Sequence, residues 1–325
     1  MKTKTISVLL IFTMIASVLT GCAVQTASAV DVDKTIINIA TGGTGGTYYP
    51  LGSAMARIYN DHIKNVTTNV LVTDASIENI KLIANGKSEI AFVQNDVAYY
   101  AWTGAESFTD KVENIRGMAM LYPEVIQIVA SKDSRIMGIE DLKGKKVAVG
   151  ALNSGTEIHT RQILAEYGMT YEDLQKADYL SFNDAADHLK DKEIDAAFIT
   201  AGIPTSAISE IIETEDFVLV PLTSACIASL NEKYPFYTEV NIPANSYNNQ
   251  SNNIRSAAVM AMLVVPKDLD EYLVYNLTKH LFEQRQVLIN SHEKGREIRL
   301  AIALKDMPIT LHPGAQRYYN EKGVL

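Results

Sequence analysis

The 325-residue sequence predicts an α/β fold of two lobes with a ligand cleft between them. Short apolar segments alternate with segments whose apolar residues repeat at helical spacing, which is typical of α/β proteins with mostly parallel sheets. This alternation occurs as two successive sets of elements along the chain. The length also suggests about two domains, at roughly 100–200 residues each.

The first set of elements precedes residue 120. Strands are expected at 36–40, 69–73 and 90–93, and helices are expected from about residue 49, from residue 76 and from about residue 94. Pro50 suits the first turn of a helix, where its missing N–H has no partner to lose. Ser76 is a residue type that caps helices, and Ile77, Ile80 and Ile83 then share one helical face.

The second set follows residue 120. Strands are expected at 125–131, 147–150, 195–200, 218–220 and 257–265, with helices at 154–168, after residue 204, at 269–290 and at about 292–303. Ser154 and Glu157 have the spacing of a capping box, and Gly168 is well placed to end that helix. The stretch 223–256, rich in Asn, Ser and Tyr, is expected to be irregular.

Five of the expected strands end in turns of small or polar residues that each open a helix. The turns are 42–49, 74–77, 94–96, 151–157 and 201–205. Ligands of open α/β sheets bind beyond the carboxyl ends of the strands, where helix N–H groups and dipoles favour a carboxylate or phosphate. The alternative reading is structural: Ser76 and Ser154 only cap helices, and Pro204 only shapes its turn. The glycine run 42–46 fits neither the dinucleotide fingerprint nor the P-loop.

Composition excludes several classes of protein. Nucleic-acid-binding domains carry an excess of basic residues, whereas this sequence has a net charge of −9. No nucleic-acid partner is therefore expected. Two cysteines, Cys22 and Cys226, rule out a disulfide scaffold and paired CxxC zinc sites. No spacing indicates a catalytic triad or a metal cluster, so we expect no enzyme, cofactor or metal. His159 and Cys226 are expected to be structural.

The first residues predict export and a lipid anchor. Lys2 and Lys4 precede an apolar run that ends in a lipobox-like Leu19-Thr20-Gly21-Cys22, so residues 1–21 read as a lipoprotein signal peptide. Residues 22–34 then form the lipidated cysteine and a flexible tether. The alternative is ordinary secretion with cleavage after Ala29. We expect an extracytoplasmic monomer held to the bilayer of the cell membrane, at the cell surface or in the periplasm, through Cys22.

An ordered series of motifs resembles one family of receptors. It begins with the run Gly42-Gly43-Thr44-Gly45-Gly46-Thr47-Tyr48-Tyr49-Pro50 and continues through Ser76-Ile77-Glu78-Asn79, Val93-Gln94-Asn95-Asp96, Leu121-Tyr122-Pro123-Glu124, Asn153-Ser154-Gly155-Thr156, Gly202-Ile203-Pro204 and Leu311-His312-Pro313-Gly314. The series is similar to that of the TAXI receptors, the TRAP-associated extracytoplasmic immunogenic proteins, which are the solute-binding subunits of TRAP transporters. The resemblance covers about residue 36 to the C-terminus.

The resemblance implies a periplasmic-binding-protein fold of type II, with two α/β lobes joined by a two-segment hinge. Lobe I is expected at 35–122 plus 252–325 and lobe II at 123–251, with crossings near 122–126 and 252–257. It implies no chemistry on the ligand. The receptor captures a small organic acid or amino acid, such as glutamate or a related carboxylate, and delivers it to an ion-coupled TRAP permease. The alternative is a receptor of the same fold serving an ABC importer or a sensor.

The turns and the resemblance together assign sixteen ligand-binding residues. They are Gly43, Thr44, Gly45, Gly46, Thr47, Tyr48, Ser76, Gln94, Asn95, Asp96, Asn153, Ser154, Gly155, Thr156, Gly202 and Pro204. The segments 42–52, 74–79, 94–97 and 151–157 contain no Lys or Arg. We therefore expect N–H groups, hydroxyls and amides to meet the charge of a carboxylate, in place of an arginine fork. A neutral or zwitterionic ligand fits the same inventory.

Overall fold

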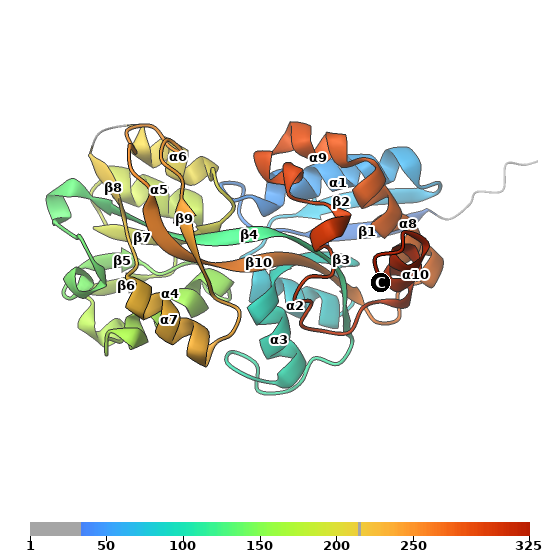
Figure 1. Cartoon of the computed structure of the whole chain (residues 1–325), viewed down its shortest axis with the longest axis horizontal. Helices are drawn as coiled ribbons and strands as arrows, with labels where there is room; N and C mark the ends of the chain where they lie inside the picture. The colour runs from blue at the N-terminus through green and yellow to red at the C-terminus, as the bar shows by residue number, and fades with distance from the viewer. Residues whose placement is uncertain (1–33, 214–215) are drawn as a thin grey trace, which may run out of the picture. The chain divides into compact units, whose positions relative to one another are not determined.

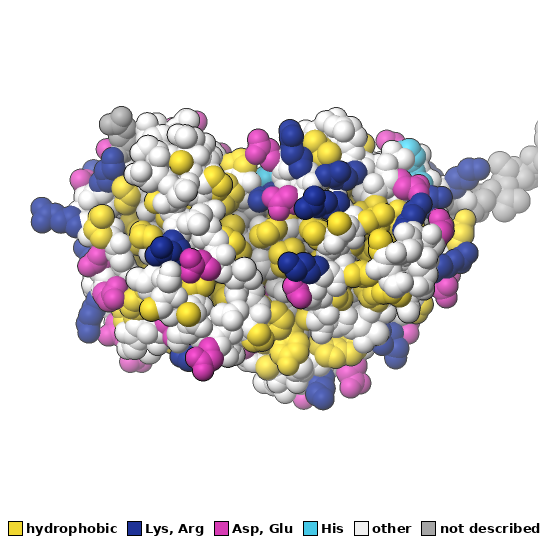
Figure 2. Space-filling model, viewed as in Figure 1, with side chains coloured by type: hydrophobic (Ala, Val, Ile, Leu, Met, Phe, Trp, Pro, Cys, Tyr) yellow, Lys and Arg dark blue, Asp and Glu magenta, His cyan; other side chains and the backbone are white. Residues whose placement is uncertain are grey.

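The computed structural model describes residues 34–213 and 216–325. The predicted signal peptide, Cys22 and nearly all of the tether lie outside these described residues. Within them, no helix combines the length and the apolar character that crossing a membrane requires. Figure 2 shows one face of the chain, on which basic and acidic side chains are interspersed rather than gathered by sign.

The described residues contain one continuous ten-stranded sheet. Its order is β2-β1-β3-β10-β4-β7-β5-β6, with β8 on β4 and β9 on β10. The strands are β1 (Thr35–Ala40), β2 (Val66–Leu71), β3 (Ile90–Gln94), β4 (Ile115–Ser131), β5 (Lys146–Ala148), β6 (Lys176–Asp178), β7 (Ala196–Ala201), β8 (Phe217–Val220), β9 (Thr238–Ile242) and β10 (Ile254–Pro266).

The sheet is mixed, which corrects the expectation of a mostly parallel one. Strands β1–β3 pair in parallel, as do β5–β7. Every pairing that involves β4 or β10 is antiparallel. The reason is that these two long strands run through the middle of the sheet in opposite directions and join its two parallel parts (Figure 1).

Helices cover both faces of each half of the sheet. They are α1 (Tyr48–His62), α2 (Ser76–Ala84), α3 (Asn95–Thr103), α4 (Gly155–Glu166), α5 (Phe182–Lys190), α6 (Ser206–Ile212), α7 (Ser224–Lys233), α8 (Glu271–Glu283), α9 (Arg285–Ser291) and α10 (Pro313–Glu321). Four apolar clusters result. In one half α1, α8 and α10 pack on one face and α2 and α3 on the other. In the other half α4 and α7 oppose α5 and α6 (Figure 1).

Several expected elements differ from those observed. The stretch 223–256 contains α7 and β9, because the apolar residues among 224–233 bury one helical face that includes Cys226. The expected helix 269–290 is interrupted at Gln284, between α8 and α9. In place of a helix at 292–303 there are two short 3₁₀ turns. Gly295 lies against the backbone of Leu288, so the chain turns back here rather than extending as a helix.

The long strands β4 and β10 belong to both halves. The carboxyl-terminal part of β4 pairs with β7 and β8, while β10 pairs with β3 near its carboxyl end and with β9 near its start. The expected crossings near 122–126 and 252–257 fall in the middle of β4 and at the start of β10. The assignment of 35–122 plus 252–325 to lobe I and 123–251 to lobe II stays a prediction, which a measurement of lobe movement would test.

Candidate functional site

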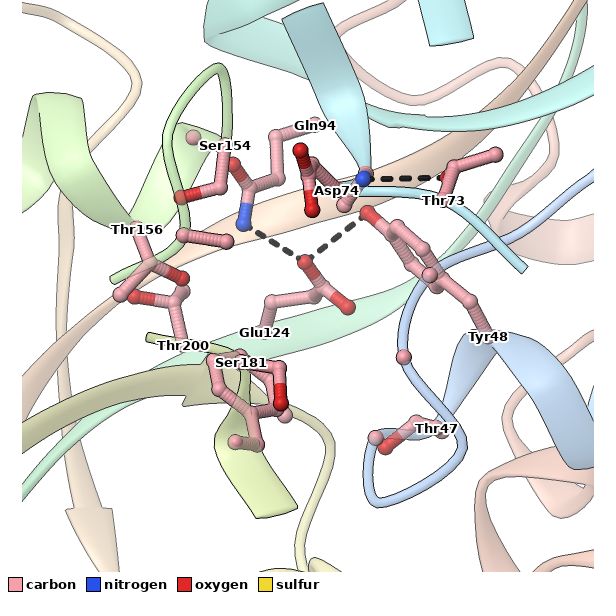
Figure 3. A pocket seen from close by; sticks show the side chains of 18 residues that line it. Thr47, Tyr48, Thr73, Asp74, Gln94, Glu124, Ser154, Thr156, Ser181 and Thr200 are labelled. Atoms are coloured by element: carbon pink, nitrogen blue, oxygen red, sulfur yellow. Dashed lines mark hydrogen bonds between the residues drawn. The ribbon is translucent and has the colours of Figure 1, made fainter. Parts of the chain in front are cut away.

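A cavity lies where the loops of the two halves meet. Its volume is about 50 Å³. It is lined by Gly42, Gly43, Gly46, Thr47, Tyr48, Thr73, Asp74, Ala75, Gln94, Glu124, Ala151, Ser154, Gly155, Thr156, Ser181, Phe182, Thr200 and Ala201 (Figure 3). Each of the five polar turns singled out in the sequence contributes at least one of these residues. The carboxyl ends of β1, β3 and β7 bring those turns together, as expected for strand ends in an α/β sheet.

Half of the sixteen assigned residues line this cavity. They are Gly43, Gly46, Thr47, Tyr48, Gln94, Ser154, Gly155 and Thr156. The other eight do not line it: Thr44, Gly45, Ser76, Asn95, Asp96, Asn153, Gly202 and Pro204. Most of these eight hold the walls of the cavity or join its two sides, so the turns were assigned more widely than the cavity extends.

Two of the residues outside the cavity support its wall on the side of β3, and two more, on the glycine turn, contact the other half. Ser76 Oγ accepts a hydrogen bond from the backbone N–H of Gln94 (3.1 Å). Asn95 Oδ1 accepts from the N–H of Met260 in β10 (2.9 Å). On the glycine turn, Thr44 Oγ1 accepts from Asn183 Nδ2 (2.8 Å), and the carbonyl of Gly45 accepts from the N–H of Ala207 (3.2 Å). Both contacts made by the glycine turn reach the other half of the molecule.

Asn153, which the sequence analysis assigned to ligand binding, instead bonds to the first turn of α2. Its carbonyl accepts hydrogen bonds from the N–H groups of Ile77 (3.1 Å) and Glu78 (3.3 Å), in the first turn of α2. The φ of Asn153 is +65°, a left-handed conformation that asparagine tolerates better than most residues. Because these two N–H groups are already satisfied by the protein, the amino end of α2 offers less to an anion than the sequence predicted.

The amino ends of α1 and α4 face the cavity from opposite halves. Thr47 precedes α1 and Ser154 precedes α4, and both residues line the cavity. Ser154 Oγ accepts from the N–H of Glu157 (3.2 Å), which confirms that it caps its helix. The remaining N–H groups of the first turns and the positive ends of both helix dipoles favour a negatively charged or carbonyl oxygen in the cavity.

Glu124 is the central polar group of the cavity, and the sequence reasoning did not assign it to the site. Its side chain is buried in β4, with a residue exposure of 2%. Glu124 Oε2 accepts hydrogen bonds from Tyr48 Oη (2.9 Å) and Gln94 Nε2 (2.9 Å) (Figure 3). Burial raises the pKa of Glu124 to about 8, against an ordinary value of 4.5. The available signal was an acidic residue inside an otherwise apolar strand.

Asp74 is the second carboxyl group of the lining. Burial and the nearby Glu78 raise its pKa. Its backbone N–H donates to Glu78 Oε2 (2.6 Å), which fixes the loop between β2 and α2. The lining residues include no Lys, Arg or His. In the part of the chain that the structure describes, the cavity therefore combines two helix amino ends with two carboxyl groups and no side-chain cation.

A chain of buried polar groups closes one side of the cavity. His159 Nε2 lies 2.9 Å from Asp96 Oδ2, and His159 Nδ1 lies 3.1 Å from Thr200 Oγ1. Both Asp96 and His159 are fully buried. Asp96 comes from α3 in one half, whereas His159 and Thr200 come from α4 and β7 in the other. The chain of bonds therefore joins the two halves, while the absence of any other role for His159 stays a prediction.

Thr47 and Gly202 make a second connection between the halves. Thr47 Oγ1 accepts from the N–H of Gly202 (3.1 Å) and lies 3.5 Å from its carbonyl oxygen. Gly202 must be free of a side chain, because a Cβ there would lie 2.7 Å from Lys294 Cγ and 3.0 Å from Thr47 Oγ1. The adjoining Ile203–Pro204 peptide bond is cis. These contacts join the two halves beside the cavity.

The chain has an α/β fold with a cavity between its two halves, and comparison with known proteins agrees on the fold. The chain belongs to the NMT1-like family, whose model matches residues 39–323. The fold is similar to that of PhnD1 from Prochlorococcus marinus in complex with methylphosphonate, with a TM-score of 0.56, 10% identity and coverage of 89% of this chain and 99% of that one.

Two further solved structures share the fold. One is a protein from Bordetella bronchiseptica RB50, with a TM-score of 0.52, 15% identity and coverage of 90% of this chain and 83% of that one. The other is a binding-protein component of an ABC phosphonate transporter from Pseudomonas aeruginosa, with a TM-score of 0.50, 15% identity and coverage of 82% and 80%. The predicted α/β fold of the periplasmic binding proteins is confirmed.

The more specific prediction of a TAXI receptor of a TRAP transporter is wrong. The family that matches nearly the whole described chain is the NMT1-like family, and the structural neighbours include a component of an ABC transporter rather than of a TRAP system. The motifs quoted for the resemblance lie at strand-to-helix turns and in the central strand β4, and most of them serve the architecture of the fold. Motifs of that kind indicate the fold more securely than the transporter that the protein serves.

Proposed function

We propose that this protein is an extracytoplasmic solute-binding protein that delivers a small polar solute to a membrane importer of the ABC type. The observation that carries the proposal is the cavity between the two halves, toward which polar groups from both halves converge. The NMT1-like family and the fold likeness to a component of an ABC phosphonate transporter support it. Binding in such a cavity requires no chemical change of the solute.

We further propose that the solute is a small amino acid rather than a phosphonate. A phosphonate would place its negative charge beside Asp74, with no side-chain cation in the lining to oppose that carboxylate. An amino acid fits the same groups without that conflict. Its carboxylate oxygens accept hydrogen bonds at the amino ends of α1 and α4, while its ammonium group lies toward Asp74.

Thermal melting in the presence of three probes tests the ligand class. L-alanine and L-glutamate are expected to raise the melting temperature, whereas methylphosphonate is not. A ligand at one hundred times its Kd adds about 2.7 kcal/mol to the free energy of unfolding, which is a shift of several degrees. Asp74→Asn is expected to abolish the amino-acid shift, and the exposed Asp61→Asn in α1 serves as its control. A shift with methylphosphonate alone would show that the ligand class is wrong.

Mass spectrometry of solute released from the denatured protein identifies the natural ligand. The proposal expects an intact amino acid in about a one-to-one ratio with the chain. The chain of bonds Asp96–His159–Thr200 has side-chain types found in hydrolases, so the experiment includes hours of incubation of the bound solute before release. Conversion of the solute during that time would contradict a purely binding role.

The lipid anchor at Cys22 remains a proposal, because Cys22 lies outside the described residues. It rests on the lipobox-like Leu19-Thr20-Gly21-Cys22 alone. We expect Cys22→Ser to shift the protein from the membrane fraction into the soluble fraction or to leave it unprocessed, as followed by fractionation and mass. Cys226→Ser is the matched control, since Cys226 is buried in α7. A correctly cleaved Cys22→Ser protein that stays on the membrane would refute lipid anchoring.

A further inference from the structure

The carboxyl group of Glu124 is held at one oxygen and free at the other. Tyr48 Oη and Gln94 Nε2 both donate to Oε2, each over 2.9 Å. Glu124 lines the cavity, and among the hydrogen bonds of the described residues none involves its Oε1. Two neutral donors thus fix the orientation of the carboxyl group, and its second oxygen is left for the contents of the cavity (Figure 3).

The charged and titratable groups around Glu124 give it little support as an anion. Tyr48 from α1 and Tyr122 from β4 are both buried, and burial raises their own pKa values far above the ordinary value, so each remains a neutral phenol. Asp96 from α3 raises the pKa of Glu124, and Asp74 lines the same cavity. Among the described residues, the cation that acts on Glu124 is Lys294, which lowers the pKa of Glu124 but is itself paired with Glu297 over 2.7 Å.

We propose that Glu124 is a specificity-determining residue. In the solute-bound protein its own carboxyl group is a neutral acid, and its Oε1–H donates a hydrogen bond to an acceptor oxygen of the solute. This inference rests on the proposed function and deepens it. When the halves open, water reaches the carboxyl group and stabilises the carboxylate. When they close on a solute, the carboxylate takes one proton from the solvent and becomes the donor. Solute binding is then accompanied by the uptake of about one proton at neutral pH.

The consequence for selectivity follows from the two carboxyl groups. A neutral Glu124 donates a hydrogen bond to a solute oxygen, which an ionised carboxylate would repel. It provides no negative charge to balance an ammonium group of the solute. Asp74, which is more accessible to solvent, remains the acceptor for the ammonium group. The cavity thus distinguishes the two ends of a zwitterion by the protonation of two carboxyl groups, without a lysine or arginine.

Thermal melting of the full chain saturated with L-glutamate, in which the proposal has the two halves closed on the solute, provides the first test. The unfolded chain loses the proton of Glu124 near the ordinary pKa of 4.5, whereas the folded chain keeps it until about pH 8, so burial of this residue favours folding at low pH and opposes it above. From about pH 5 to about pH 9, the melting temperature of wild type should fall relative to that of Glu124→Gln. The exposed Glu232→Gln control should follow wild type. A pH-independent difference between wild type and Glu124→Gln would overturn the proposal.

Proton uptake on binding is the second test. Calorimetric titration with L-glutamate at pH 7 in phosphate and in Tris gives the number of protons taken up. We expect about one in wild type and none in Glu124→Gln, which keeps a donor and should bind within a few-fold of wild type, while Glu124→Ala binds about tenfold more weakly or worse. Binding with no proton uptake, or equal uptake in Glu124→Gln, would overturn the proposal. If L-glutamate, L-alanine and methylphosphonate all fail to bind, the proposed function fails, whereas binding without proton uptake overturns only the role proposed for Glu124.

Discussion

At the scale of single residues, Gly155 shows how closely the two halves fit. A Cβ at this position would lie 1.5 Å from Gln94 Oε1 and 2.7 Å from Gln94 Cδ. Gln94 is buried and bonded to Glu124, so it has little freedom to move aside. The first residue of α4 is therefore a glycine because the opposite half comes so near, and not because its backbone conformation requires one.

We predict that Gly155→Ala weakens solute binding about tenfold or more, which corresponds to at least about 1.4 kcal/mol. The added methyl group displaces Gln94 and removes a donor from Glu124, even though alanine favours helix over glycine by up to about 1 kcal/mol. Calorimetry with the amino-acid probe measures the change. Gly138→Ala is the control, because a Cβ there would meet only the flexible end of Glu140 at 3.3 Å. Wild-type affinity in Gly155→Ala would contradict the fit described here.

Thr47 and Ser154 offer a comparison of two hydroxyl groups that both line the cavity. Removing the Thr47 hydroxyl leaves the N–H of Gly202 without its partner in the closed form, at about 1–3 kcal/mol. We predict that Thr47→Ala lowers affinity by about tenfold or more with little change in melting temperature, and that Thr47→Ser retains affinity. Ser154→Ala removes the cap of α4 and should lose about 1 kcal/mol of stability. Equal effects of the two alanine variants on melting and affinity would refute this division of roles.

At the scale of elements, α3 and α4 are joined across the cavity by Asp96 and His159. Both side chains are fully buried and lie 2.9 Å apart. When one partner of a buried pair is removed, the other stays desolvated without its hydrogen-bond or charge partner. This costs about 3–5 kcal/mol. This cost falls on the closed form, because separation of the halves returns both groups to water.

A double-mutant cycle on this pair measures the connection. Asp96→Ala and His159→Ala should each weaken solute binding strongly, and the double variant should lose much less than the sum of the two. We expect a coupling energy of about 0.5–3 kcal/mol from the four calorimetric affinities. The exposed pair Lys192–Asp133, at 3.0 Å, provides the matched control, for which no coupling to binding is expected. Strictly additive losses for Asp96 and His159 would contradict a role in closure.

At the scale of the whole molecule, the connections between the halves predict a change of shape on binding. We expect the radius of gyration from solution scattering to fall when L-glutamate saturates the wild-type protein, because closure buries the solute between the halves. Gly155→Ala should show no such contraction at the same solute concentration. A radius of gyration that stays constant while calorimetry shows saturation would exclude hinge closure and, with it, the predicted lobe boundaries.

Much of the architecture was predictable from local patterns. The short apolar strands of the first set and the Ser154 cap of α4 in the second set depend on neighbours within a few residues, and the structure confirms them. The expected Ser76 cap is wrong, because Ser76 is the first residue of α2 and its Oγ accepts from the N–H of Gln94. The stretches 223–256 and 292–303 were predicted wrongly, because local patterns alone do not determine their structure. Their form depends on packing against α4 and α9, which no local pattern contains.

The sequence by itself determined the α/β class, the polar turns that meet at the cavity, and the lack of lysine and arginine in those turns, because each of these follows from residue types at short spacing. Only the tertiary structure decided which turn residues reach the cavity and which join the two halves. It also placed Asp74 in the lining and decided the importance of Glu124, whose pKa is raised by burial among groups distant in sequence. Desolvation and hydrogen bonding are properties of a site after folding, and a single sequence does not display them.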